Sequence, residues 1–238
     1  MTNQNKRVLL VTGASRGVGK GIAERMARSG DIIICAARSK KKGSTVQQFG
    51  FEIQSSLDET IEKIKAKGAN GTAYSIDLNN QKEILELSDY IKKEFGQLDI
   101  LVHSACQIHD DLVQPKPYWK KSVDLWSVMD VGLKSNYLLS HALTPLMIES
   151  KGKLIVQISS HGAMCYMHGP IYGAQKAGID KMAFDMAYDL KPHDICSLSL
   201  WSGIVKDEKT QKVSEMHGEQ YAEFLKGAAS QEYAGFVI

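Results

Sequence analysis

The sequence predicts an α/β protein built on a doubly wound parallel sheet, and two observations lead to this prediction. Six short runs of apolar, often β-branched residues have turn residues at their edges, as buried strands do. They cover residues 7–11, 31–36, 72–76, 99–102, 153–158 and 195–200. Longer amphipathic stretches alternate with them, at residues 19–28, 57–67, 81–95, 123–149 and 172–190. A repeated strand–helix–strand order of this kind is typical of Rossmann-type folds.

Composition and charge exclude several classes of function. Lys and Arg number 29 against 27 Asp and Glu, so the net charge of +2 gives no electrostatic footprint for nucleic acid. The four cysteines form no C-x-x-C pair and the histidines show no metal-binding spacing, so we expect no metal and no disulfide framework. No apolar stretch approaches the roughly 20 residues that span a bilayer, and the N-terminus is too polar for a secretory signal. We therefore expect a cytoplasmic protein without membrane or nucleic-acid partners.

A cluster of glycines, TGASRGVG, lies between the first predicted strand and the first predicted helix. Gly13 allows a sharp turn, Gly17 lets the backbone approach a pyrophosphate, and Gly19 allows the helix to pack closely on the sheet. The N-terminus of that helix then points at the phosphates. Glycines alone also mark ordinary turns, and the spacing differs from the common G-x-G-x-x-G. The strand before them and the helix after them favour dinucleotide binding.

The end of the second predicted strand favours NADP over NAD. NAD-binding sheets usually carry an acidic residue there, which binds the ribose 2′-OH, whereas this chain has Ala36, Ala37 and Arg38. The guanidinium groups of Arg38 and Arg16 can instead pair with a 2′-phosphate. The alternative interpretation, a solvated run of charge without a role in binding, suits the neighbouring lysines, residues 40–42, better than the two arginines.

Two segments interrupt the regular alternation, although nothing divides residues 1–238 into more than one expected domain. Residues 39–56 are longer than the usual loop between a strand and a helix. They form either a surface excursion near the cofactor site or a disordered flap, and we favour the excursion. Residues 203–230 follow the sixth strand at its carboxyl end, where open α/β sheets bind ligands, and contain a helical pattern rich in Lys and Glu. This segment is a candidate lid.

Tyr172 and Lys176 lie four residues apart at the start of a predicted helix, so their side chains share one helical face. The ammonium group can stabilise the phenolate and bind the nicotinamide ribose, and Tyr172 can then act as the general acid of carbonyl reduction. The same spacing also occurs by chance with a purely structural role. Ser159 and Ser160 end the fifth strand, where a hydroxyl can hold a substrate carbonyl.

Together these motifs resemble the short-chain dehydrogenase/reductase (SDR) family. The resemblance covers the whole chain through TGASRGVG, FGQLDILV, ISS, YGAQK and LWSGIV, and is closest to the dehydrogenase/reductase member 1 subgroup. It implies a single NAD(P)-binding Rossmann domain over residues 1–238. It also implies NADP-dependent hydride transfer between nicotinamide and a small carbonyl or alcohol substrate. The expected assembly is a homodimer built on the helices at residues 123–149 and 172–190.

The resemblance assigns roles to individual residues. The catalytic residues are Ser160, Tyr172 and Lys176, and the alternative serine is Ser159, which the usual interval back from the tyrosine selects. The cofactor-binding residues are Gly13, Ser15, Arg16, Gly17, Val18, Gly19, Arg38, Asp77, Leu78, Ser104, Ala105, Tyr172, Lys176, Gly203 and Val205.

The chain departs from the family pattern at several positions. His103-Ser104-Ala105-Cys106 replaces N-N-A-G, Gly132 replaces the usual catalytic Asn, and Asp207 replaces the Thr that binds the nicotinamide carboxamide. The family's final strand is lacking, so we expect an exposed sixth strand. The leading prediction is an NADPH-dependent carbonyl reductase. These departures motivate the alternative, a catalytically impaired NADP-binding scaffold or sensor.

The substrate is expected to be a ketone or aldehyde of modest size and partly apolar character. This expectation depends on a set of aromatic and methionine side chains that can equally be core residues. They are Trp119, Trp126, Met164, Tyr166, Met167 and Trp201.

Overall fold

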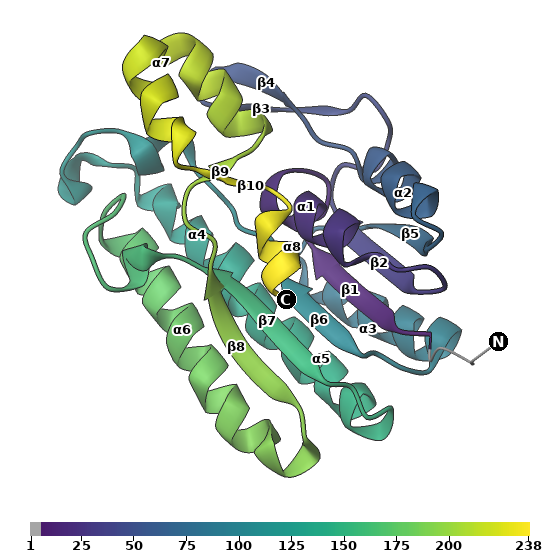
Figure 1. Cartoon of the computed structure of the whole chain (residues 1–238). Coiled ribbons are helices and arrows are strands. Elements are labelled where there is room, and N and C mark those ends of the chain that lie inside the picture. The colour runs from purple at the N-terminus through teal and green to yellow at the C-terminus, as the bar shows by residue number, and fades with distance from the viewer. Residues whose placement is uncertain (1–5) are drawn as a thin grey trace. The chain divides into compact units, whose positions relative to one another are not determined.

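The computed structural model describes residues 6–238, except the side chains of residues 216–222 and 224. It contains a central parallel sheet of six strands with flanking helices, which confirms the predicted Rossmann-type α/β fold (Figure 1). The chain forms two compact units. The first unit comprises residues 6–75 and 202–238, and the second unit comprises residues 76–201.

Three parallel strands of the sheet belong to the first unit. They are β1 (Val8–Thr12), β2 (Ile32–Ala37) and β5 (Asn70–Ser75), in the order β5-β2-β1. Ile32 is opposite both Val8 and Asn70. Every residue of β1 and β2 is buried, as expected for short apolar runs covered on both faces. The three predicted strands are therefore confirmed to within two residues.

Helices of the first unit pack through small or apolar residues. In α2 (Leu57–Ala66), the N-cap Ser56 accepts the Glu59 N–H, and the buried face includes Leu57 and Ile64. In α1 (Gly17–Met26), Gly21 leaves no room for a side chain because the Gln231 carbonyl lies against it. This close approach lets the short helix α8 (Tyr233–Val237) pack on α1.

Residues 39–56 form a surface excursion, as favoured, and contain an antiparallel hairpin. Its strands are β3 (Thr45–Gln48) and β4 (Phe51–Gln54). Phe49 and Gly50 take positive φ values of 54° and 81° in the turn between them. Helix α7 (Glu208–Lys226), the predicted Lys- and Glu-rich helix, lies beside β4 (Figure 1). A short parallel pair, β9 (Val205–Lys206) and β10 (Ala229–Ser230), joins the segments that flank α7.

The second unit holds the other three strands. They are β6 (Ile100–His103), β7 (Leu154–Ser159) and β8 (Cys196–Trp201), in the order β6-β7-β8 and all parallel. Strand β6 is buried throughout, whereas β8 is an edge strand. The Leu198 and Trp201 side chains are 40% and 42% exposed, in agreement with the predicted exposure of the sixth strand.

Two predicted helices of the second unit are confirmed. Helix α3 (Gln81–Phe95) has the predicted bounds because Asn80 caps its start and Gly96, with φ 64°, ends it. Helix α6 (Pro170–Leu190) begins two residues before the prediction, because Pro170 suits the first helical turn. It packs along β7 and β8 (Figure 1). Short 3₁₀ turns lie at Asp110–Val113, Tyr118–Lys120, His161–Ala163 and Lys191–His193, besides one described below.

The prediction of one continuous helix over residues 123–149 is wrong. A 3₁₀ turn (Val123–Trp126) and α4 (Ser127–Met129) come first, and a π-helical segment (Asp130–Lys134) separates them from α5 (Ser135–Glu149). Inside that segment, Val131 and Gly132 have φ values of −106° and 128°, which no α-helix accommodates. The apolar pattern continues across the break, so periodicity alone does not reveal it.

Among the described residues, no helix combines the length and apolarity needed to cross a membrane.

Candidate active site

The glycine loop between β1 and α1 requires its glycines. Gly13 and Gly17 have positive φ values of 70° and 55°, a region that other residues rarely adopt. The Gly13 N–H donates to the Ala36 carbonyl at 2.8 Å, which fixes the turn against β2. A side chain on Gly19 would collide with the Gly13 carbonyl, so α1 begins directly against the loop. The result is a backbone loop at a helix N-terminus, whose N–H groups fit a pyrophosphate.

Arg16 lies in this loop with part of its guanidinium group buried. One nitrogen, Nη2, donates to Gln48 Oε1 at 3.3 Å, whereas the buried Nη1 finds no acceptor among the described residues. Burial lowers the pKa of Arg16, Asp207 and Glu208 raise it, and the charge of Arg38 lowers it further. The unpaired N–H of Arg16 and the nearby guanidinium of Arg38 could both donate hydrogen bonds to a phosphate group.

The other residues predicted to bind cofactor in the first unit have local structural roles as well. Ser15 is buried, and its Oγ lies 3.0 Å from Ser55 Oγ at the base of the hairpin. Val18 follows Gly17 in the first turn of α1. Gly203 takes φ 66° before β9, and Val205 is buried within β9, which packs against α1.

The carboxylate of Glu208 contacts the glycine loop, and the sequence analysis did not predict this contact. Its Oε2 accepts the Gly17 N–H at 3.0 Å, and its Oε1 accepts Lys20 Nζ at 3.2 Å. Asp207 precedes it and closes a capping box with Thr210, which begins α7. The contact joins residues 191 positions apart, so no local pattern reports it. The placement of residues 203–230 at a carboxyl strand end was the only sequence signal.

In the second unit, the structure brings Ser160, Tyr172 and Lys176 together. Ser160 Oγ lies 3.1 Å from Tyr172 Oη. Lys176 is buried, and its Nζ lies 5.5 Å from the centroid of the Tyr172 ring while donating to the Ile158 carbonyl at 3.3 Å. Ser159 is buried, and its Oγ donates to the Lys176 carbonyl at 3.3 Å. This geometry supports Ser160 over Ser159 as the serine that faces the phenol.

Gly162 makes the close approach of Ser160 and Tyr172 possible. Ser160 follows β7 in an extended conformation and caps the next turn by accepting the Gly162 N–H at 3.2 Å. A Cβ on Gly162 would lie 2.8 Å from Tyr172 Cε1, so the ring packs against bare backbone. The hydroxyl and the phenol are therefore positioned by the end of a strand and the start of α6.

Gly132, at the position of the family's catalytic Asn, lies in the helix break. With φ 128° it occupies a conformation that favours glycine, and its N–H donates to Ser135 Oγ at 3.0 Å. The buried Gln175 side chain fills the neighbouring space. Its Nε2 donates to the Val128 carbonyl and, at 3.3 Å, to the Val131 carbonyl. A Cβ on Gly132 would lie 2.5 Å from that nitrogen, so an asparagine side chain there would have to displace the Gln175 amide.

His103, the last residue of β6 and the first that differs from the family's N-N-A-G, points into the core. It is fully buried, and its Nε2 lies 2.8 Å from Ser140 Oγ of α5. Burial lowers the pKa of His103 to about 3, so the imidazole stays neutral. Ser104 and Ala105 come next and are partly buried.

Asp77 and Leu78, predicted to contact adenine, follow Ile76 at the start of the second unit. The Asp77 carboxylate accepts the Asn79 N–H at 3.0 Å, so it stabilises the turn before α3. Leu78 is buried. Both residues retain a structural role whatever ligand they contact.

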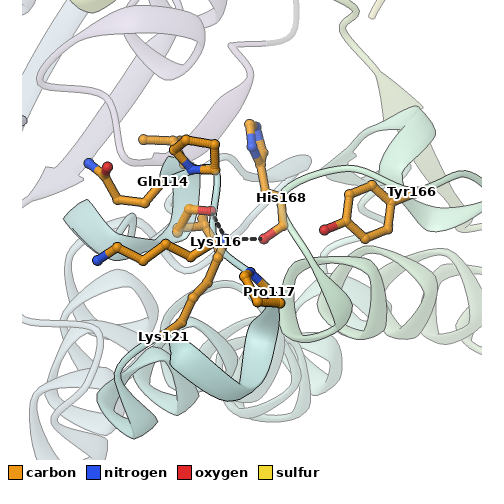
Figure 2. Close-up of a pocket in the computed structure, with 9 residues that line it drawn as sticks. Gln114, Lys116, Pro117, Lys121, Tyr166 and His168 are labelled. Atoms are coloured by element: carbon orange, nitrogen blue, oxygen red, sulfur yellow. Dashed lines mark hydrogen bonds between the residues drawn. The ribbon is translucent and has the colours of Figure 1, made fainter.

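A pocket of about 390 Å³ lies in the second unit (Figure 2), and two of its lining residues, Leu112 and His168, pack near Tyr172. Lys121 Nζ joins two of its walls by donating to the carbonyls of Leu112 and His168 at 2.7 and 3.2 Å. The His168 ring contacts the Tyr172 ring edge to face, and Leu112 belongs to the core cluster on which Tyr172 packs. The lining residues are Leu112, Val113, Gln114, Pro115, Lys116, Pro117, Lys121, Tyr166 and His168.

Most of the side chains considered for substrate binding are not core residues. Met167 is partly buried, and the other five are exposed, which corrects the core interpretation for those five. Tyr166 lines the pocket, and Trp201 Nε1 donates to the Asp180 carboxylate at 3.0 Å. The exposed members are Trp119, Trp126, Met164, Tyr166 and Trp201.

The glycine loop on a Rossmann-type sheet and the Ser–Tyr–Lys cluster are typical of nicotinamide-dependent oxidoreductases. A family model described as short chain dehydrogenase matches residues 7–218. The chain belongs to the short-chain dehydrogenase/reductase family, which confirms the predicted resemblance.

Individual relatives and solved structures agree with this family. Dehydrogenase/reductase SDR family member 1 of Homo sapiens is 33% identical over 208 residues, which cover 86% of this chain and 62% of that protein. The chain thus spans less than two thirds of the length of this relative, as it does for the Mus musculus protein of the same name.

Two solved structures extend the comparison. A metagenomic short-chain oxidoreductase in complex with NADP has a TM-score of 0.70 and 27% identity, covering 83% of this chain and 82% of that chain. L-sorbose reductase from Gluconobacter frateurii, complexed with NADPH and L-sorbose, has a TM-score of 0.78 and 20% identity, covering 97% of this chain and 87% of that chain. The second likeness concerns the fold alone.

Proposed function

We propose that this protein is an NADP(H)-dependent carbonyl reductase whose residues 1–238 act as one Rossmann domain. The observation that carries the proposal is the 3.1 Å separation of Ser160 Oγ and Tyr172 Oη, with Lys176 Nζ close to the same ring. A phenol that contacts a hydroxyl and has an ammonium group near its ring suits proton transfer to a carbonyl oxygen. NADPH supplies the hydride when bound.

Each member of the cluster has a separate part in the proposed reaction. Tyr172 donates its proton to the substrate oxygen while a hydride adds to the carbonyl carbon, so the product is an alcohol and the phenolate is left. Ser160 donates a hydrogen bond to that oxygen and orients it. The Lys176 ammonium stabilises the phenolate. In the reverse direction the same groups oxidise an alcohol.

The preference for NADP is supported by two positively charged side chains near the end of β2 in the first unit, and by the absence of a carboxylate on the last residue of that strand. Arg16 has a buried N–H without an acceptor among the described residues, Arg38 is nearby, and Ala37 places no carboxylate at the end of β2. The metagenomic relative is solved with NADP. The residues proposed to hold the cofactor are Gly13, Ser15, Arg16, Gly17, Val18, Gly19, Arg38, Asp77, Leu78, Ser104, Ala105, Tyr172, Lys176, Gly203 and Val205.

The proposed substrate, assembly and location follow from three further observations. The pocket lined by His168, whose ring contacts Tyr172, has space for a small ketone or aldehyde.

Tyr137 of α5 and Phe184 and Tyr188 of α6 are exposed aromatic side chains, which support a homodimer through these helices. The four cysteines are free thiols, which supports a cytoplasmic location.

A second candidate function is an NADP-binding scaffold or sensor without catalysis. Two observations favour it: the missing side chain at Gly132, and the carboxylate of Glu208 on the glycine loop. Under this function the protein binds NADPH but turns over no carbonyl substrate.

Turnover of a panel of ketones and aldehydes with NADPH, measured beside fluorescence-detected NADPH binding, separates the two functions. We expect consumption of NADPH with at least one small ketone or aldehyde. A matched pair of variants tests the site: Ser160→Ala should lower kcat by about a hundredfold, whereas Ser159→Ala should change it far less. NADPH binding without turnover of any panel member would favour the scaffold, and absence of both would reject both functions.

A further inference from the structure

The first turn of α1 is capped by a residue from the distant helix α7. The Gly17 N–H donates to Glu208 Oε2 at 3.0 Å, although the N-cap position belongs to Arg16. Lys20, one turn further along α1, donates to the other carboxylate oxygen at 3.2 Å. The Lys20 and Glu208 side chains are only 11% and 23% exposed, so the ion pair is largely screened from water.

This arrangement places a negative charge where a dinucleotide needs a free backbone N–H. Helix N-termini attract anions through their unpaired N–H groups and the helix dipole. A carboxylate and a phosphate oxygen compete for the same donor, because one N–H makes one strong hydrogen bond. The Asp207 carboxylate adds to the effect, since its Oδ2 lies 3.1 Å from the position of a Cβ on Gly17.

We propose that Glu208 is the residue that sets the affinity of the dinucleotide site, because its carboxylate holds the anion position of the glycine loop. A pyrophosphate must displace that carboxylate from Gly17 and Lys20 before it binds, and the first turn of α7 moves away from α1 with it. The inference rests on the dinucleotide binding of the proposed function and not on its reaction.

The variant Glu208→Gln, which removes the negative charge, should still fold. The start of α7 is held by Asp207 and Thr210, whose reciprocal hydrogen bonds measure 2.8 Å and do not involve Glu208. Glutamine has the same length and shape, so it removes the charge and little else. Glu215 supplies the matched control because it lies on the same helix, is exposed, and pairs only with its helical neighbour Lys212 among the described ion pairs.

The first test compares dissociation constants for NADPH by fluorescence titration. We expect Glu208→Gln to bind NADPH about tenfold more tightly than the unchanged protein, which is equivalent to about 1.4 kcal/mol. Glu215→Gln, with the same change in net charge, should match the unchanged protein. Equal or weaker NADPH binding by Glu208→Gln would overturn the inference, and so would an equal gain in Glu215→Gln.

The second test uses the unchanged protein and inorganic pyrophosphate as the probe. Hydrogen exchange followed by mass spectrometry should show slower exchange at Gly17–Met26 and faster exchange at the first turn of α7 when pyrophosphate is added. Protection of α1 without faster exchange in α7 would show that the carboxylate is not displaced. That result would overturn the inference even if Glu208→Gln failed to fold.

The outcomes distinguish this inference from the proposed function. Tighter NADPH binding by Glu208→Gln with no turnover on the carbonyl panel would leave the inference standing and reject the reductase. Turnover by the unchanged protein with no change in NADPH affinity in Glu208→Gln would do the reverse. If no protein bound NADPH, both would fail.

Discussion

The two units of the molecule depart from the family pattern in different ways. In the first unit Gly13 and Gly17 of the glycine loop take positive φ, and the departure is Asp207, next to which Glu208 places its carboxylate against that loop. In the second unit the Ser160, Tyr172 and Lys176 cluster is assembled, and the departure is a break in the helix at Gly132. The first site carries a carboxylate on its glycine loop, and the second lacks the side chain of the family's asparagine.

This difference determines how readily each departure can be reversed. A side-chain contact at the surface of a helix can be exchanged for a ligand or removed by one substitution. A backbone with φ 128°, packed against the buried Gln175, cannot accept the family's asparagine without rearrangement. We therefore expect one substitution to remove the Glu208 contact of the first unit, whereas one substitution at Gly132 should not restore the family's asparagine in the second.

The largest effect should come from the phenol of the second unit. Tyr172→Phe removes the proton donor but keeps the ring that packs on Leu112 and Val128, so the fold should survive. We expect kcat to fall by about 10²–10⁴-fold, with NADPH affinity nearly unchanged. Steady-state rates and fluorescence titration would check this. Retention of most of the turnover would show that the second unit does not carry the chemistry as assigned.

Introducing the family's asparagine at Gly132 should destabilise the protein. Gly132→Asn would force a side chain into positive φ and to within 2.5 Å of Gln175 Nε2, so we expect it to destabilise the protein by roughly 2–4 kcal/mol. Thermal or denaturant unfolding measures this. Gly227→Asn is the control, since its φ of −83° and open surroundings accept a side chain. A gain in stability or activity from Gly132→Asn would contradict the conclusion that the second unit cannot accept the asparagine.

Acid should weaken the second unit through His103. Because burial lowers its folded pKa to about 3, the unfolded chain binds a proton that the folded chain refuses between about pH 3 and 6.5. Stability is then complete above about pH 6.5 and falls as the pH drops, by about 2 kcal/mol at pH 5. Denaturant titrations at pH 8 and pH 5 would measure the loss. His103→Asn should reduce it, whereas substitution of the exposed His193 should not.

The smallest expected effect tests the cofactor preference of the first unit. We expect NADPH to bind about tenfold more tightly than NADH, or about 1.4 kcal/mol, and Ala37→Asp to reverse the order. Asn70→Asp makes a comparable acidic change at the amino end of β5, away from the carboxyl end of β2, and should leave the preference intact. Equal dissociation constants for the two cofactors in the unchanged protein would contradict the role given to Arg16 and Arg38.

Local patterns predicted most of the fold. Strands β1, β2 and β6 are short apolar runs, and burial on both faces leaves such runs few alternatives. The bounds of α3 were also predictable, because Asn80 and Gly96 are strong signals for the start and end of a helix. Residues 123–149 misled the prediction because their apolar pattern continues through Val131 and Gly132, where the backbone is not helical.

The features that sequence reasoning missed depend on contacts between distant residues. Gln175 fills the space beside Gly132 from a different helix, and Glu208 reaches Gly17 from 191 positions away. Which of Ser159 and Ser160 faces the phenol also depends on tertiary contacts, since neighbouring residues at a strand end face opposite ways. Residue types identified the candidates, and only tertiary contacts assign them to partners.

The excursion between β2 and α2 is closed at its base. The Ser39 and Lys40 carbonyls accept the N–H groups of Leu57 and Asp58, each at 3.0 Å, so the two ends of the insertion are hydrogen-bonded neighbours. The entropy of closing a loop grows only slowly with its length once its ends are fixed together. The strand and helix on either side therefore form a platform on which segments of different length and sequence can be exchanged, as in loop grafting, while the sheet beneath keeps its register.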